Sequence, residues 1–97
     1  MFLVRDIMYC KPGKVRPTVE KFKKLAAMGS SFGFGQMRVM TDLTGEFNRV
    51  VMEHTAESMA EFEKRMQETM ASSTYRERMA GYTELWITGT REILRVV

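Results

Sequence analysis

The sequence predicts an α+β domain whose elements follow one another in the order β-α-β-β-α-β. A run rich in β-forming residues, 47–54, leads directly into an amphipathic helix, which places a strand and a helix in succession. A short turn at residues 42–45 joins that run to the preceding one, so we expect an antiparallel hairpin. The chain has 97 residues, enough for a single domain spanning residues 1–97 with a limited core.

The first strand and the first helix are predicted within residues 2–28. Residues 2–9 carry apolar side chains on both faces, a pattern typical of a strand that is covered on both sides. Pro and Gly within residues 11–14 end this strand. Residues 15–28 repeat apolar side chains at spacings of four, three and four, which predicts a helix that Gly29 ends. The expected buried stripe of this helix consists of Val15, Val19, Phe22 and Ala26.

The hairpin and the second helix are predicted within residues 30–70. Residues 30–35 predict a loop rich in small residues, followed by a strand at about 34–40 and, after the turn, by the strand 47–54. Thr55 is the expected N-cap of the next helix. The apolar face expected for this helix consists of Met59, Phe62, Met66 and Met70.

The last quarter of the chain predicts a short extra helical turn and a final strand. The helical turn is expected at 71–80, and strand-like segments follow at 83–88 and 91–97. Gly89 between these segments indicates a bend or a bulge. The complete order matches the ferredoxin-like arrangement with an antiparallel sheet. Because its two helices cover one face of that sheet, we expect a second subunit to cover the other.

The composition narrows the classes of function. Hydrophobic residues make up 44% of the chain and charged residues 28%, which is typical of a soluble globular protein. No apolar run approaches the ~20 residues that span a bilayer, and residues 1–9 do not form a secretory signal. Cys10 is the single cysteine, so an internal disulfide is excluded. We therefore expect a cytoplasmic protein that has no membrane partner.

The net charge is +3, and basic residues are concentrated in the first quarter of the chain. A nucleic-acid surface is one interpretation of this cluster. The segment lacks interleaved aromatic residues and a base-reading helix motif, so we favour a solvated helix face and expect no nucleic-acid partner. The ten methionines lie mostly at predicted helix or strand positions, which indicates core filling.

The single histidine, His54, is the first candidate site residue. One histidine excludes a triad or a multi-histidine metal site within one chain, and a pair with Cys10 has no nucleophile motif to support it. His54 shares a predicted strand face with Asn48. It would either exchange a proton at the mouth of a cleft or lie at a strand end with backbone hydrogen bonds. We favour the second interpretation.

Two arginines in predicted strands, Arg38 and Arg49, require an anionic partner because an unpaired buried charge is costly. They would either clamp a ligand carboxylate or enolate, or pair with a carboxylate such as Glu46 or Glu53. We favour the ion pairs.

Four aromatic residues would either line a ligand cavity between the sheet and a second subunit or pack that interface. They are Tyr9, Phe34, Tyr82 and Trp86. Glu53 and Glu84 become candidate acid–base groups only if they point into such a cavity.

Four segments carry a family resemblance: Lys-Pro-Gly-Lys at 11–14, Asn-Arg-Val-Val at 48–51, Glu-Ser-Met-Ala-Glu at 57–61 and Arg-Glu-Ile-Leu-Arg at 91–95. On these segments the chain resembles the NIPSNAP family of the dimeric α/β-barrel superfamily, in the right order and over nearly its whole length. The resemblance implies a homodimer in which two sheets close into a barrel. It implies no settled catalytic residue.

The chain departs from the family at three positions. Met8, His54 and Ala56 stand where the family favours aromatic residues. Some relatives in the superfamily bind or degrade haem, which makes His54 a candidate axial ligand by resemblance. We nevertheless expect no cofactor and no metal.

Two functional hypotheses follow. The first is a module that binds a small apolar or aromatic molecule in a cleft between the sheet and the dimer interface. The second, implied by the superfamily alone, is a cofactor-independent monooxygenase or isomerase of the antibiotic-biosynthesis-monooxygenase type. We favour the first and leave open whether the protein is an enzyme. The candidate ligand-binding residues are Tyr9, Asn48, Arg49, His54, Tyr82 and Trp86.

Overall fold

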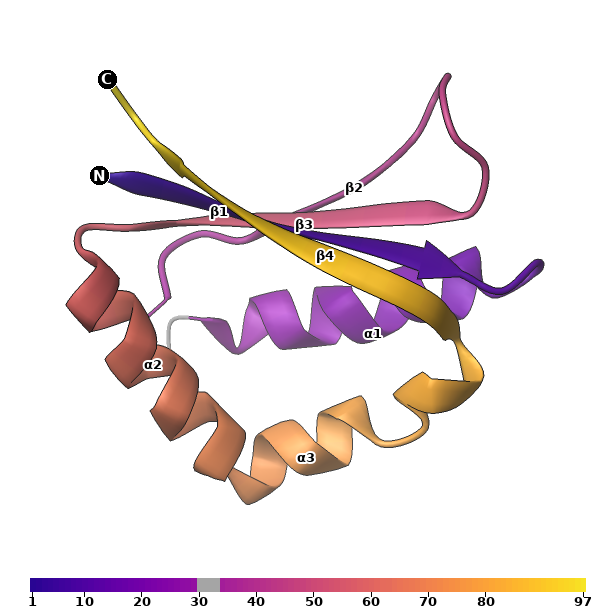
Figure 1. Cartoon of the computed structure of the whole chain (residues 1–97). Helices are drawn as coiled ribbons and strands as arrows, with labels where there is room; N and C mark the ends of the chain where they lie inside the picture. The colour runs from indigo at the N-terminus through magenta and orange to yellow at the C-terminus, as the bar shows by residue number, and fades with distance from the viewer. Residues whose placement is uncertain (30–33) are drawn as a thin grey trace.

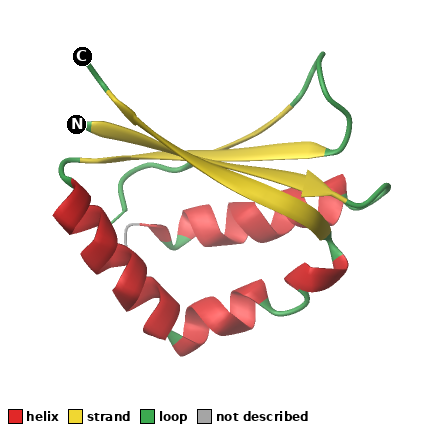
Figure 2. Ribbon diagram, in the orientation of Figure 1, coloured by secondary structure: helices red, strands yellow, loops and turns green. Residues whose placement is uncertain are grey.

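The computed structural model describes residues 1–29 and 34–97, and in this part of the chain four strands form one antiparallel sheet in the order β2-β3-β1-β4. The helices lie on one face of the sheet, and the other face is open (Figures 1 and 2). This layout confirms the predicted ferredoxin-like α+β fold. The elements are β1 (Phe2–Cys10), α1 (Val15–Ala27), β2 (Arg38–Thr41), β3 (Arg49–Ala56), α2 (Met59–Ala71), α3 (Ser73–Met79), the 3₁₀ helix η2 (Tyr82–Glu84) and β4 (Trp86–Arg95).

The two faces of the sheet follow from the alternation of side chains along each strand. On β3, Val50, Met52 and His54 are buried on the helix-covered face, whereas Val51 and Glu53 belong to the open face. One core cluster under the helices consists of Cys10, Phe22, Leu25, Val50, Met52 and Met79. A second consists of Val4, Phe34, Ala56 and Phe62. None of the described helices is both long and apolar enough to cross a membrane.

Helix α1 buries a face that overlaps the predicted stripe. Phe22 is buried, and Val15 and Val19 are partly buried against the same core cluster. Thr18 and Leu25, which the prediction omitted, are also buried. Thr18 tolerates burial because its hydroxyl is satisfied: Oγ1 donates to the Lys14 carbonyl oxygen at 2.8 Å and accepts from Cys10 Sγ at 3.4 Å.

Helix α2 begins later than predicted, and its N-cap is Ser58 rather than Thr55. Ser58 Oγ accepts a hydrogen bond from the Glu61 backbone N–H at 3.1 Å, and Thr55 still belongs to β3. The buried positions are Phe62 and Thr69, whereas Met70 is 57% exposed. The prediction for Met70 is therefore wrong. Thr69 takes the inward position because its hydroxyl donates to the Arg65 carbonyl oxygen at 2.8 Å.

β2 is shorter than predicted, and β3 is shifted by two residues, because it ends at Ala56 rather than at 54. β2 begins at Arg38 rather than at 34, and β3 begins at Arg49 rather than at 47. Asn48 has φ of +64°, a left-handed conformation that does not continue a strand. Phe47 consequently lies outside the sheet and is 92% exposed. The part of the predicted loop at residues 30–33 lies outside the described residues.

The C-terminal strand β4 is continuous, and the bend or bulge predicted at Gly89 lies two residues earlier. Tyr9 pairs with Thr88 and Cys10 with Trp86, which leaves Ile87 as the extra residue. A Cβ at Gly89 would lie 2.6 Å from Met8 Cε, so the flexible Met8 side chain would have to move, and 3.2 Å from the Ile7 carbonyl oxygen. Residues 83 and 84, predicted as strand, belong to η2.

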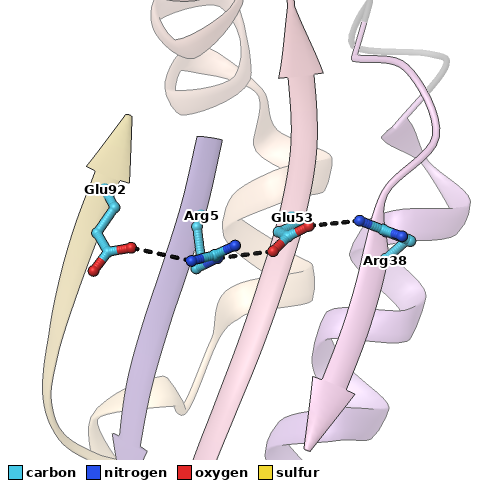
Figure 3. A network of polar contacts seen from close by, with 4 residues as sticks. All are labelled: Arg5, Arg38, Glu53 and Glu92. Carbon is cyan, nitrogen blue, oxygen red and sulfur yellow. Dashed lines mark hydrogen bonds and ion pairs between the residues drawn. The ribbon is translucent and has the colours of Figure 1, made fainter. Parts of the chain in front are cut away.

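The open face carries a row of four charged side chains that spans all the strands of the sheet (Figure 3). This charge row consists of Glu92, Arg5, Glu53 and Arg38, in that order across the sheet. Arg5 donates to Glu92 at 3.3 Å and to Glu53 at 2.8 Å, and Arg38 donates to Glu53 at 2.7 Å. Burial would raise the pKa of Glu53, but the hydrogen bonds from the two arginines outweigh it and lower the pKa.

Candidate functional site

A cleft lies between the helix-covered face of the sheet and the helices. Its inner pocket, about 50 Å³ in volume, is lined by Asp6, Leu25, Gly29, Phe34, Met37, Met52, His54, Met66, Thr69, Tyr75 and Arg91. An adjoining groove of about 410 Å³ is lined by Asp6, Met8, Phe22, Leu25, Met52, Tyr75, Met79, Tyr82, Trp86, Gly89, Thr90 and Arg91. The structure thus places the cleft on the helix side of the sheet rather than on the face expected to meet a second subunit.

His54 reaches the inner pocket because it lies on the helix-covered face of β3. It is 4% exposed, and its ring centroid lies 4.7 Å from that of Phe34 and 6.0 Å from that of Phe62. Its Nδ1 is buried and has no hydrogen-bond partner among the described residues. Burial lowers the pKa of His54, Asp6 opposes this effect, and the nearby arginines Arg91 and Arg65 lower the pKa further. The imidazole is therefore neutral at pH 7.

We expect the His54→Gln variant to lose less stability than the wild type when the pH falls from 7 to 5.5. The folded-state pKa of His54 lies below the unfolded value near 6.5, so the unfolded chain binds more protons in this range and the wild type is destabilised as the pH falls. His54 is the single histidine, and no other side chain has an ordinary pKa in this window. Urea denaturation at both pH values measures the effect. Equal pH dependence of the two proteins would contradict it.

An ion pair between Asp6 and Arg91 lies at the junction of the inner pocket and the groove. The two residues face each other in the register of β1 and β4. Arg91 Nε donates to Asp6 Oδ1 at 2.6 Å, and Nη2 donates to Oδ2 at 3.2 Å. The guanidinium also lies over the Phe62 ring, 5.5 Å from its centroid. The hydrogen bond to Asp6 raises the pKa of Arg91, so the guanidinium stays charged at neutral pH.

Sequence reasoning did not select this pair. The available signal was a charge on an otherwise apolar strand face, since Asp6 shares its face of β1 with Phe2, Val4 and Met8.

Aromatic side chains form the far end of the groove. The ring of Trp86 lies 5.4 Å from that of Phe22 and 5.1 Å from that of Tyr82, centroid to centroid. Trp86 Nε1 is buried and, within the described part of the chain, has no hydrogen-bond acceptor. Burial raises the pKa of Tyr75, which lines both the pocket and the groove, so it stays a neutral phenol.

Three of the six candidate ligand-binding residues line the cleft: His54, Tyr82 and Trp86. The other three do not. Tyr9 and Arg49 face each other in the register of β1 and β3 on the open face of the sheet. Asn48 lies in the turn before β3, where its carbonyl oxygen accepts from the Cys10 N–H at 2.7 Å.

The two strand arginines make ion pairs rather than clamps in the cleft. Arg38 pairs with Glu53 in the charge row, as the favoured interpretation expected. Arg49 pairs with Asp42, with Nε 2.9 Å from Oδ2, rather than with a glutamate. Because the charge row lies on the open face of the sheet, Glu53 faces away from the cleft. Glu84 is exposed in η2 and does not line the cleft either.

The structure contradicts the Cys10–His54 pair. Cys10 Sγ donates to Thr18, and His54 faces Val4, six residues away from Cys10 along β1. At ~3.3 Å per residue that offset is about 20 Å. Among the described residues, no three His, Cys, Asp or Glu side chains gather to hold a metal ion. The 50 Å³ pocket beside His54 is far below the roughly 300–1,000 Å³ of ordinary ligand sites, so a haem does not fit there.

No protein-family model and no curated protein sequence matches this chain. Solved structures do match it. A NIPSNAP-like domain protein from Burkholderia xenovorans has a TM-score of 0.86 at 17% identity, over 99% of this chain and 84% of that one. A NIPSNAP family protein of unknown function from Agrobacterium tumefaciens has a TM-score of 0.86 at 16% identity, over 97% and 86%. An antibiotic biosynthesis monooxygenase has a TM-score of 0.76 at 12% identity, over 100% and 99%. At these identities the likeness establishes a shared fold, which confirms the ferredoxin-like fold of the single chain.

Proposed function

We propose that this protein binds a small apolar or aromatic molecule in the cleft between its sheet and its helices. The observation that carries this proposal is a pair of buried ring nitrogens, His54 Nδ1 and Trp86 Nε1, that have no partner among the described residues. Each such group costs about 1–3 kcal/mol when it is left unsatisfied. Because both residues line an otherwise largely apolar cleft, a ligand with one or two polar atoms would offset this cost.

The groove has the size and the walls for such a ligand. Its volume of about 410 Å³ lies within the range of roughly 300–1,000 Å³ that small-molecule sites occupy. Trp86 and Tyr82 supply flat aromatic surfaces, and Met8, Met52 and Met79 supply flexible thioethers that adapt to irregular shapes. A bicyclic aromatic molecule suits this combination.

A titration with 2-naphthamide, a neutral bicyclic aromatic, tests the proposal. We expect saturable 1:1 binding by isothermal titration calorimetry, and Trp86→Ala, which removes the aromatic wall, should weaken it about tenfold, or ~1.4 kcal/mol. Trp86→Phe keeps a ring but lacks the N–H and should lie between the two. The control is Phe47→Ala, which truncates an aromatic side chain that is 92% exposed and outside the cleft. Absence of saturable binding to the wild type, or equal affinities for Trp86→Ala and Phe47→Ala, would refute the proposal.

A second candidate function is oxygenation of an aromatic substrate without a bound cofactor. The observation that favours it is the neutral, buried imidazole of His54, whose unpartnered nitrogen can accept a proton from an activated methylene or enol. The resulting carbanion supplies the electrons to O₂, and the net change converts CH₂ and O₂ into C=O and H₂O. Oxygen uptake with anthrone as the probe distinguishes this activity from binding alone. A rate equal to the protein-free rate, or unchanged in His54→Gln, would exclude it.

We further propose that the open face of the sheet pairs with a second copy of the chain. Apolar side chains, Leu3, Ile7 and Val51 among them, flank the charge row on this face. The row alternates negative and positive across the sheet, so a two-fold axis parallel to the strands, between Arg5 and Glu53, would place each charge opposite one of the other sign. A cytoplasmic location without membrane or nucleic-acid partners remains a prediction from composition.

A further inference from the structure

The Asp6–Arg91 ion pair occupies the middle of the proposed binding cleft. Both residues line the inner pocket as well as the groove, so a ligand that extends from Trp86 toward His54 passes them. Both carboxylate oxygens of Asp6 accept from Arg91, at 2.6 and 3.2 Å. The Asp6 side chain is 15% exposed and that of Arg91 40%, so the pair is partly withdrawn from solvent.

The charges of the cleft cancel. Of the described residues that line the inner pocket and the groove, Asp6 and Arg91 alone carry a charge at neutral pH, because His54 and Tyr75 are neutral. The remaining walls are mostly apolar. A ligand therefore meets a paired dipole rather than a free cation or a free carboxylate.

An anionic ligand is disfavoured in such a cleft. A carboxylate entering beside Arg91 would lose its hydration shell and would have to displace the Asp6 carboxylate or lie next to it. A neutral amide or hydroxyl group does not meet this repulsion. Shape and apolar contact are the same for both kinds of ligand, so the difference lies in charge.

We propose that the Asp6–Arg91 pair makes the cleft selective for an uncharged aromatic ligand over an anionic one of the same shape. This inference rests on the proposed binding function and adds the chemical class of the ligand. The Asp6 carboxylate sets specificity because it neutralises Arg91, the cation that β4 places in the cleft. Removing the carboxylate should convert the same cleft into a site for aromatic acids.

Two probes of nearly identical shape test this selectivity: neutral 2-naphthamide and ionised 2-naphthoate, titrated calorimetrically at pH 7. We expect the wild type to bind the amide about tenfold more tightly than the acid. Asp6→Asn leaves Arg91 without its counter-charge and should shift this ratio toward the acid by about tenfold or more. The matched control is Asp42→Asn, which breaks another two-pronged Asp–Arg pair, with Arg49, away from the cleft and should leave the ratio unchanged.

Arg91→Gln supplies a second measurement that does not depend on the folding of Asp6→Asn. In this variant the Asp6 carboxylate is the one charge of the cleft and repels an anion. The ratio of the affinities for 2-naphthamide and 2-naphthoate should therefore move further toward the amide. Circular dichroism identifies which variants are folded. Failure of 2-naphthamide to bind the wild type would refute the binding function itself. Binding of both probes with equal affinity, or a ratio that stays constant in the folded variants, would overturn the charge selectivity and leave the binding function standing.

Discussion

Replacing Phe22 with alanine is expected to lower the free energy of unfolding by about 3–5 kcal/mol. Phe22 is 2% exposed and packs in the core cluster with Cys10, Val50 and Met79. Its ring also supports Trp86 at the end of the groove. The truncation removes this apolar burial and leaves a cavity that a sheet and a helix cannot easily close. Because domains of this size are stable by roughly 5–15 kcal/mol, the loss is a large share of the total.

Urea denaturation of Phe22→Ala and of Phe47→Ala measures this difference with the same chemical change at two positions. Phe47 is 92% exposed, so its truncation should change the free energy of unfolding by less than about 0.5 kcal/mol. Similar losses in the two variants would show that Phe22 is not part of the core as the structure has it.

Replacing Val51 with lysine is expected to abolish the homodimer that we propose. Val51 lies on the open face of the sheet, opposite Ile7 of β1 and Met40 of β2. In a dimer joined through this face the new ammonium group would be buried without a partner, at a cost of several kcal/mol. A loss of about 3 kcal/mol corresponds to a factor of about 10² in the dissociation constant. Light scattering at micromolar concentration should give twice the 11.3 kDa chain mass for the wild type, and the monomer mass for the variant.

The control for this experiment is Ala60→Lys, which adds the same charge to an exposed position of helix α2 and should leave the mass unchanged. A wild type with the monomer mass, or a variant that stays dimeric, would exclude pairing through the open face.

The order of the elements could be predicted from local patterns, whereas the orientation of the helices could not. A threonine reads as polar in a sequence, yet Thr18 and Thr69 are buried because each hydroxyl bonds to a backbone carbonyl one helical turn earlier. The buried faces of α1 and α2 therefore include these threonines and differ in part from the stripes that the apolar spacing predicts. The start of α2 was recoverable: Ser58 and Glu61 have the spacing of a capping box, a stronger signal than Thr55 alone.

Only some of the predicted site residues line the cleft, because odd- and even-numbered residues of a strand face opposite sides of the sheet. His54 is an even-numbered residue of β3 and faces the helices with Val50 and Met52, as expected for residues that share a strand face. Arg49 is odd-numbered and therefore belongs to the opposite face. The Asp6–Arg91 pair joins residues 85 positions apart, and only the register between β1 and β4 brings them together. A pairing that depends on that register is not visible in either segment alone.

The central place of β1 in the sheet has a consequence for the synthesis of the protein. β1 is translated before the other strands of the sheet, but it lies between β3 and β4, and Phe2 pairs with Arg95 of the last strand, β4. A ribosome must therefore complete residues 86–95 and release them from its exit tunnel before β1 has both neighbours. Until then the nascent chain exposes one edge of a largely apolar strand, which is a site for chaperones and for aggregation. We infer that the sheet of this domain is completed only after β4 has left the exit tunnel.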